Sequence, residues 1–158
     1  MPTAEPVNLL DFIRRQRGER QPAFVVIGPP LSGKSAFARQ LAARSGGGYL
    51  NVLEAFSRSP DRARSIDRFD EAALRQWLID QAAPPLDTLL VDDLDFLLAT
   101  WDDLAPFQEM VRTLTHPDRT VVFGFFLQTR SDFDGWPLRR GDRTPRRVLR
   151  LDEIQALD

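Results

Sequence analysis

The chain has 158 residues, 42% of them hydrophobic, so we expect a single domain with a real core and little room for a second module. It has no cysteine and one histidine, which excludes a disulfide framework and a Cys/His zinc site. The net charge of -2 argues against a protein that coats nucleic acid through its overall field. No apolar run is long enough for a membrane span and no secretory signal pattern is present, so we expect a cytoplasmic protein without a membrane partner.

The first part of the chain alternates helix and strand patterns around a glycine-rich loop. Apolar residues at helical spacing predict a short N-terminal helix at 7–17, and the apolar run at 23–27 is typical of a strand buried on both faces. A helix is predicted at 35–44, where a run of three glycines follows, and a second strand at 49–53. Strand, loop and helix therefore occur in the order that a phosphate-binding loop requires.

The middle of the chain continues this alternation. After an irregular polar stretch at 57–67, the pattern predicts a helix at 70–82 and a buried strand at 88–91. A further helix is predicted at 102–115, with a proline in its first turn, where proline is tolerated.

The last part carries two more predicted strands, at 120–126 and 147–151, separated by a long arginine-bearing loop. Strands that alternate with helices predict an α/β fold. We expect a three-layer sandwich with a mainly parallel five-stranded sheet and no lid domain, of the P-loop NTPase type because the loop at 28–35 matches GxxxxGKS. After the short helix at 7–17, the single domain would comprise a nucleotide-binding core at 23–129, followed by an arginine-rich loop and the last strand at 130–151.

The only lysine among 21 basic residues, Lys34, lies in Gly28-Pro-Pro-Leu-Ser-Gly33-Lys34-Ser35, a complete GxxxxGKS match. Backbone N–H groups of such a loop converge on phosphates, the lysine reaches the β- and γ-phosphates, and the Ser35 hydroxyl ligates Mg²⁺. The predicted nucleotide-binding residues are Gly28, Ser32, Gly33, Lys34, Ser35 and Ala36. Because no other lysine exists, an Asn-Lys-x-Asp guanine motif is excluded, and we expect ATP with Mg²⁺.

A second motif, Leu89-Leu-Val-Asp92-Asp93, is an apolar strand that ends in two carboxylates. Ligands of parallel α/β folds bind at this edge of the sheet. We therefore assign Asp92 to magnesium and Asp93 to the base that activates water. The alternative is a strand end with helix-capping aspartates, and Asp95 is interpreted as a surface or capping residue.

Polar residues after the fourth strand and arginines beyond it are further candidates. Gln128 or Thr129 would lie beside the P-loop if that strand neighbours the first, and could touch the γ-phosphate or the attacking water; alternatively, they simply leave a strand. The candidates for a charge-neutralising arginine finger are Arg130, Arg139, Arg140 and Arg143. A solvated surface loop explains the same arginines equally well.

These motifs, in this order, resemble the core of the AAA+ ATPases over 23–129. The segment Leu89-Leu-Val-Asp-Asp-Leu-Asp-Phe-Leu97 is similar to that of the replication-initiator branch, where an Asp-Asp pair also occurs. The resemblance implies a homo-oligomer in which an arginine of one subunit completes the site of another.

In size and layout, the chain resembles more closely the small, lidless P-loop protein of bacteriophage exclusion (BREX) defence systems. The similarity rests on the Gly-Pro-Pro-x-Ser-Gly-Lys loop, on Asn51-Val52 followed by a serine-containing stretch around Ser57, and on the acidic third strand. It implies a bacterial, cytoplasmic ATPase subunit that works with larger defence components, through which it would act on DNA.

Three functions stay open at this point. The first is a Mg²⁺-dependent ATPase that drives or gates a partner assembly; because Asp93 is shorter than the more usual glutamate, its hydrolysis would be slow without a partner. The second is a small-molecule kinase, with Glu54 as base and the arginine-rich loop as lid. The third is a nucleotide-responsive adaptor that barely hydrolyses ATP. Strand order separates the first two, because an AAA+-type ATPase places strand four between strands one and three, whereas a kinase places strand three beside strand one.

Overall fold

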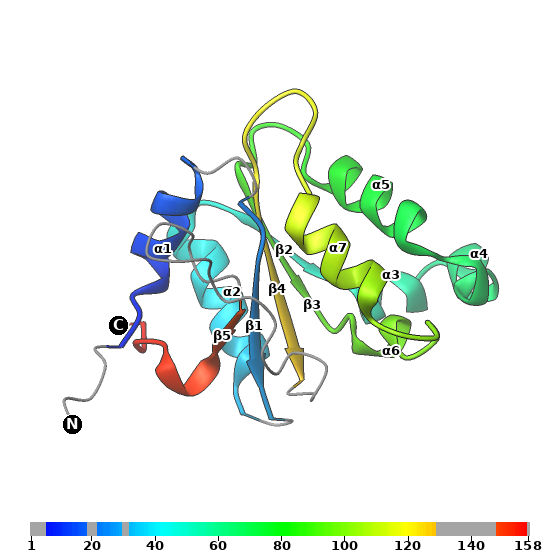
Figure 1. Cartoon of the computed structure of the whole chain (residues 1–158), viewed down its shortest axis with the longest axis horizontal. Helices are drawn as coiled ribbons and strands as arrows, with labels where there is room; N and C mark the ends of the chain where they lie inside the picture. Colours follow the sequence, from blue (N-terminus) through cyan, green and yellow to red (C-terminus); the bar gives the residue numbers. More distant parts are fainter. Residues whose placement is uncertain (1–5, 19–21, 30–31, 129–147, 158) are drawn as a thin grey trace.

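A computed structural model describes residues 6–18, 22–29, 32–128 and 148–157. It shows a five-stranded sheet with helices on both faces (Figure 1). In chain order the elements are α1 (Leu9–Gln16), β1 (Phe24–Gly28), α2 (Lys34–Ser45), β2 (Gly48–Asn51), α3 (Val52–Ser57), α4 (Pro60–Arg64), the 3₁₀ turn η1 (Ile66–Arg68), α5 (Glu71–Gln81), β3 (Thr88–Asp92), α6 (Asp95–Leu98), α7 (Ala105–Thr113), β4 (Val122–Gln128), β5 (Val148–Arg150) and the 3₁₀ turn η3 (Leu151–Glu153).

All strand pairs in the sheet are parallel, and the strand order is β2-β3-β4-β1-β5. This confirms the predicted α/β fold with a five-stranded parallel sheet. The strand β4 lies between β1 and β3, and its last residue, Gln128, pairs with Gly28 at the start of the glycine-rich loop. At the far side of β3, Asn51 pairs with Asp92. The ends of four strands therefore meet at one edge of the sheet.

Two apolar layers hold the helices on the sheet. One layer joins α1 and α2 to one face, and the other joins α3, α5, α6 and α7 to the opposite face (Figure 1). Alternate residues of β1 enter opposite layers, with Phe24 in the first and Val25 in the second, and all five residues of the strand are buried. The continuous apolar run of the sequence is thus explained by burial on both faces.

The glycine inside β4 makes room for an aromatic ring. A Cβ atom at Gly124 would lie 2.5 Å from Cζ of Phe24 and 2.9 Å from Cδ2 of Leu90. Both neighbours are fully buried, so a side chain at this position would force the core apart.

The segment after β2 differs from the prediction. The strand expected at 49–53 ends at Asn51, because the Asn51 side chain caps α3 by accepting a hydrogen bond from the backbone N–H of Glu54 at 2.9 Å. The stretch expected to be irregular is mostly helical, since Ser59 caps α4 and Pro60 occupies its first turn. Short capped helices of this kind carry too little periodicity to be predicted from apolar spacing.

The helix predicted at 102–115 begins three residues later, as α7. Asp103 lies just before it, and its side chain accepts a hydrogen bond from the N–H of Ala105, the first residue of α7, at 2.7 Å. The preceding short helix α6 was not predicted. Among the described residues, no helix has both the length and the apolar content needed to cross a bilayer.

Candidate functional site

A cavity of about 350 Å³ opens where the ends of β3 and β4 meet the glycine-rich loop and the start of α2. Its lining includes most of the predicted site residues. The lining residues are Ser32, Gly33, Lys34, Ser35, Ala36, Asp92, Asp93, Asp95 and Gln128. The predicted Gly28 lies beside a neighbouring cavity. The remaining candidates, Thr129, Arg130, Arg139, Arg140 and Arg143, lie outside the described residues.

The backbone of the glycine-rich loop turns into α2 at Gly33, which has a left-handed φ of 87°. A Cβ atom there would meet no atom within 4 Å, so glycine is favoured by the backbone conformation and not by lack of space. Helix α2 starts at Lys34, and the N–H groups of its first turn have no partner within the helix. These N–H groups border the cavity and suit an anion.

The ammonium group of Lys34 is held inside the loop. The side chain is only 9% exposed, and Nζ donates a hydrogen bond to the carbonyl oxygen of Pro29 at 2.8 Å. Lys34 also attracts the carboxylate of Asp95. The only ammonium side chain of the protein is therefore positioned at the cavity that the P-loop motif predicts.

The carboxylate of Asp92 is almost fully buried, with 2% of the residue exposed. Tyr49, on the neighbouring strand β2, donates a hydrogen bond from Oη to Oδ2 of Asp92 at 2.6 Å, and the N–H of Asp93 donates to Oδ1 at 2.9 Å. Burial, followed by the hydrogen bond to Asp92, raises the pKa of Tyr49 to about 12. The phenol therefore stays protonated at neutral pH, and its hydrogen bond holds the Asp92 carboxylate in position at the cavity.

Asp93 follows β3 with a left-handed φ of 54°, a conformation that few non-glycine residues adopt. Its Oδ2 accepts a hydrogen bond from Nδ2 of Asn51 at 2.7 Å. Asn51 thus has two roles, since its Oδ1 also caps α3. Unusual backbone angles of this kind are frequent at functional sites, and here the strained residue is the predicted base.

Asp95 was expected to be a surface or capping residue, but the structure places it in the lining of the cavity. It is half-buried at the start of α6, and its Oδ1 accepts a hydrogen bond from the backbone N–H of Gln128 at 3.0 Å. Burial raises the pKa of Asp95, while the Gln128 N–H and the charge of Lys34 oppose that rise. Asp95 joins the end of β4 to the loop after β3.

The sequence interpretation missed Tyr49, Asn51 and this role of Asp95. A signal was present in one case: an asparagine that ends a strand, three residues before a glutamate, is typical of a helix cap at the edge of the sheet. Tyr49 carried no such signal, because an aromatic residue in a strand is ordinary core material.

The cavity is suited to a magnesium ion that arrives with a phosphate ligand. Within the described ranges, no cluster of three or more His, Cys, Asp or Glu side chains could hold a metal by itself. Magnesium usually retains several waters and takes one or two protein oxygens plus phosphate oxygens. Ser35 and Asp92 line the same cavity and supply such a pair.

No protein-family model matches this chain, and no curated protein matches it in a sequence search.

Proposed function

We propose that the protein binds ATP, with its phosphates and Mg²⁺ in the 350 Å³ cavity, and hydrolyses it. One observation carries the proposal: the lysine and serine of the glycine-rich loop and the two carboxylates after β3 line this same cavity. Each has a conventional place in phosphoryl transfer.

The roles follow from the chemistry of each group. Lys34 and the N–H groups at the start of α2 bind the phosphates, and Ser35 and Asp92 hold the magnesium ion or its waters. When bound, the ion neutralises charge on the β- and γ-phosphate oxygens. Asp93 orients the attacking water and accepts its proton as the bond from the γ-phosphorus to the bridging oxygen breaks, giving ADP and phosphate. Asn51 holds Asp93 in place.

The strand order supports an ATPase over a kinase. The strand between β1 and β3 is β4, the arrangement expected for the AAA+ type, and it brings Gln128 to the cavity. In the kinase interpretation, Glu54 was the candidate base. Glu54 instead forms an ion pair with Arg58 on an exposed part of α3.

We extend the proposal to a biological role on the basis of the sequence resemblance to AAA+ and BREX proteins. In this role the ATPase is a cytoplasmic bacterial subunit, itself a homo-oligomer, and its turnover drives or gates a larger assembly of the phage-defence type that acts on DNA. An arginine from a neighbouring subunit or partner would supply the charge neutralisation. Arg130, Arg139, Arg140 and Arg143 stay candidates for that residue.

Calorimetric titration with ATP and Mg²⁺, together with phosphate release, tests the proposal. Lys34→Ala is expected to weaken ATP binding by about ten- to a hundredfold, as for loss of a charged hydrogen bond. Asp93→Asn is expected to keep binding and to lower hydrolysis by about 10²- to 10⁴-fold. Asp102→Asn, at an exposed loop position, is the matched control.

The outcomes separate the ATPase from the two alternative functions. Absence of ATP binding by the wild type, or equal binding by Lys34→Ala, would overturn the proposal. Binding without phosphate release, in the absence and presence of cellular partners, would exclude an ATPase and would leave the adaptor and the kinase, which needs an acceptor substrate. Solution mass with and without ATP and Mg²⁺ tests the assembly, because nucleotide-driven association is expected of an AAA+-type ATPase.

A further inference from the structure

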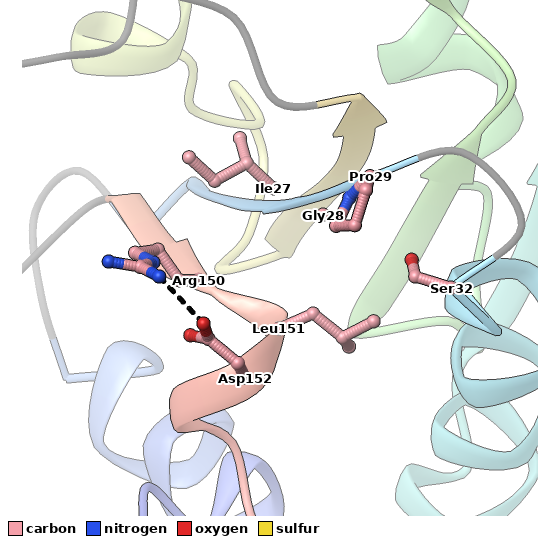
Figure 2. A pocket seen from close by; sticks show the side chains of 7 residues that line it. All are labelled: Ile27, Gly28, Pro29, Ser32, Arg150, Leu151 and Asp152. Atoms are coloured by element: carbon pink, nitrogen blue, oxygen red, sulfur yellow. Dashed lines mark hydrogen bonds and ion pairs between the residues drawn. The ribbon is translucent and has the colours of Figure 1, made fainter.

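A second cavity, of about 530 Å³, lies beside the first, where β5 runs into η3 (Figure 2). Its walls come from the end of β1 and the glycine-rich loop on one side, and from the end of β5 and the turn η3 on the other. The lining residues are Ile27, Gly28, Pro29, Ser32, Arg150, Leu151 and Asp152. Ser32 lines both cavities, so the two spaces adjoin along the loop.

The contact between the loop and η3 is close and well fixed. A Cβ atom at Gly28 would lie 3.1 Å from Cβ of Leu151 and 3.1 Å from Oγ of Ser32, so only glycine fits this approach without a shift. The turn itself is held by Glu153, whose Oε1 accepts a hydrogen bond from the N–H of Arg150 at 2.7 Å. The parallel pairing of β1 with β5 sets Ile27 opposite Arg150. The second cavity is therefore part of the folded framework.

The lining combines apolar surface with a few polar groups. Ile27, Pro29 and Leu151 provide apolar walls, and Figure 2 shows the Leu151 side chain pointing toward Ser32 while Arg150 and Asp152 face each other. The Arg150 guanidinium and the Asp152 carboxylate form an ion pair of 2.6 Å, and each side chain is 67% exposed. Apolar walls with a few polar groups are typical of sites for small-molecule ligands.

Ser32 adds an unsatisfied group at the junction of the two cavities. Its Oγ is buried and finds no hydrogen-bond partner among the described residues. A buried hydroxyl without a partner is costly, and a ligand oxygen at this point would satisfy it. The junction is where a molecule spanning both cavities would pass.

We propose that the second cavity binds the nucleoside part of a purine nucleotide, an inference that rests on the proposed ATP site. The phosphates then occupy the first cavity, Ser32 donates a hydrogen bond to an oxygen of the ribose or the nearest phosphate, and the base lies on Leu151. The Asp152 carboxylate accepts a hydrogen bond from an amino group of the base, and Arg150 donates to a ring nitrogen or carbonyl oxygen. Recognition of the base is thereby assigned to β5 and η3.

Binding of ATP and of tripolyphosphate, each with Mg²⁺, tests this assignment by calorimetry. Tripolyphosphate fills only the phosphate cavity, so the wild type is expected to bind ATP more tightly than tripolyphosphate. Leu151→Asn and Asp152→Ala are each expected to weaken ATP binding by about tenfold, close to the loss of one good contact, and to leave tripolyphosphate binding unchanged. Titration with GTP shows which purine the Arg150–Asp152 pair prefers.

Two controls match these variants. Asp61→Ala removes an exposed carboxylate that forms a 2.7 Å ion pair with Arg64, much like the Arg150–Asp152 pair. Neither Asp61 nor Arg64 lines either cavity. Leu157→Asn repeats the change at another half-buried leucine of the same apolar layer. Neither control is expected to change the ratio of ATP to tripolyphosphate affinity.

The possible failures are distinct. If the wild type binds neither ligand, the proposed ATP site is wrong, and the nucleoside site is wrong with it. If the wild type binds both ligands equally, or if Leu151→Asn and Asp152→Ala leave ATP binding unchanged, the nucleoside assignment alone is overturned. Because Asp152 is largely exposed, its variant is expected to fold even where Leu151→Asn does not.

Discussion

Tyr49 donates a hydrogen bond from Oη to Oδ2 of Asp92 at 2.6 Å, across the pairing of β2 with β3. The residue that receives it is 2% exposed and is the proposed magnesium ligand. A buried carboxylate needs its oxygens satisfied, and Tyr49 satisfies one while the N–H of Asp93 satisfies the other. The strand β2, which lies farthest from the glycine-rich loop in the sheet, thus contributes Tyr49 to the site, in addition to Asn51 at its end.

Tyr49→Phe is expected to lower the free energy of unfolding by about 1–3 kcal/mol at neutral pH, because Oδ2 of Asp92 loses its donor. Chemical denaturation without nucleotide measures this change. Phe37, a half-buried residue of α2, provides a control as Phe37→Leu, which removes ring contacts but no hydrogen bond. Equal stability of Tyr49→Phe and wild type would contradict the structural role of the phenol.

The titration of Tyr49 gives an independent test, because it is the only tyrosine in the chain. Its pKa is raised from 10 to about 12, mainly by burial. Between these values the folded state keeps the proton and the unfolded state loses it, so stability falls as the pH rises through this interval. Ultraviolet absorbance of tyrosinate, with circular dichroism to follow folding, is expected to show no ionisation near pH 10 while the protein stays folded. Tyr49→Phe has no phenol to ionise, so its stability is expected to fall less than that of the wild type between pH 10 and 12.

The two hydrogen bonds of Asn51 can be separated by substitution. Serine at this position retains an oxygen to cap α3 but loses the amide that holds Asp93, so Asn51→Ser is expected to fold normally. We expect its kcat for ATP to fall by about ten- to a hundredfold, with KM nearly unchanged, because the base is no longer held in position. Asn8 also caps a helix with its side chain, and Asn8→Ser is the control. A kcat equal to that of the wild type would contradict the positioning role.

The left-handed φ of Asp93 predicts an unusual order of stability among its variants. Asp93→Gly is expected to be more stable than Asp93→Ala by about 1 kcal/mol, because glycine accepts positive φ without a steric penalty. Both variants lose the hydrogen bond to Asn51, so the difference between them isolates the backbone term. At Glu109, on the exposed side of helix α7, the order should reverse, because alanine favours a helix and glycine does not. The same order at both positions would show that φ at Asp93 is not strained.

The fold was predictable because burial on both faces leaves a clear mark on sequence. The apolar runs at 24–27 in β1 and 89–91 in β3 have no polar position, and the glycine-rich loop follows the first of them directly. Elements defined by single capping side chains were not predictable in this way. Asn51 ends β2 and Ser59 starts α4 through hydrogen bonds that leave no periodic pattern.

At the site, the motif residues Lys34, Ser35, Asp92 and Asp93 were predicted from type and spacing, and the structure gathers them at one cavity. Tyr49 and Asp95 were not, because their roles depend on which strands are neighbours. Tyr49 reaches Asp92 only because β2 pairs with β3, and Asp95 reaches Gln128 only because β4 lies beside β3. Pairing between distant segments is a tertiary property that local patterns do not encode.

Burial disfavours the negative charge of Asp95, so we expect that removing this charge raises the stability of the protein by an amount that depends on pH. Its pKa in the folded protein is raised above the usual 3.8, mainly by burial, so its charged form costs stability at neutral pH. The cost disappears as the pH falls through the folded-state pKa, where the folded state binds the proton first. Asp95→Asn retains an oxygen for the Gln128 N–H without the charge, so it is expected to be at least as stable as the wild type at pH 7.

The same variant should bind ATP more tightly, because Asp95 attracts Lys34 and adds a negative charge to the proposed phosphate cavity. Thermal unfolding from pH 7 down to 4 and ATP titration measure both effects, and the stability gap is expected to narrow as the pH falls. Asp103→Asn is the control, since Asp103 also accepts a backbone hydrogen bond but is exposed. A wild type more stable than Asp95→Asn at pH 7, with unchanged ATP affinity, would mean that the carboxylate stabilises the strand ends and has no electrostatic part in phosphate binding.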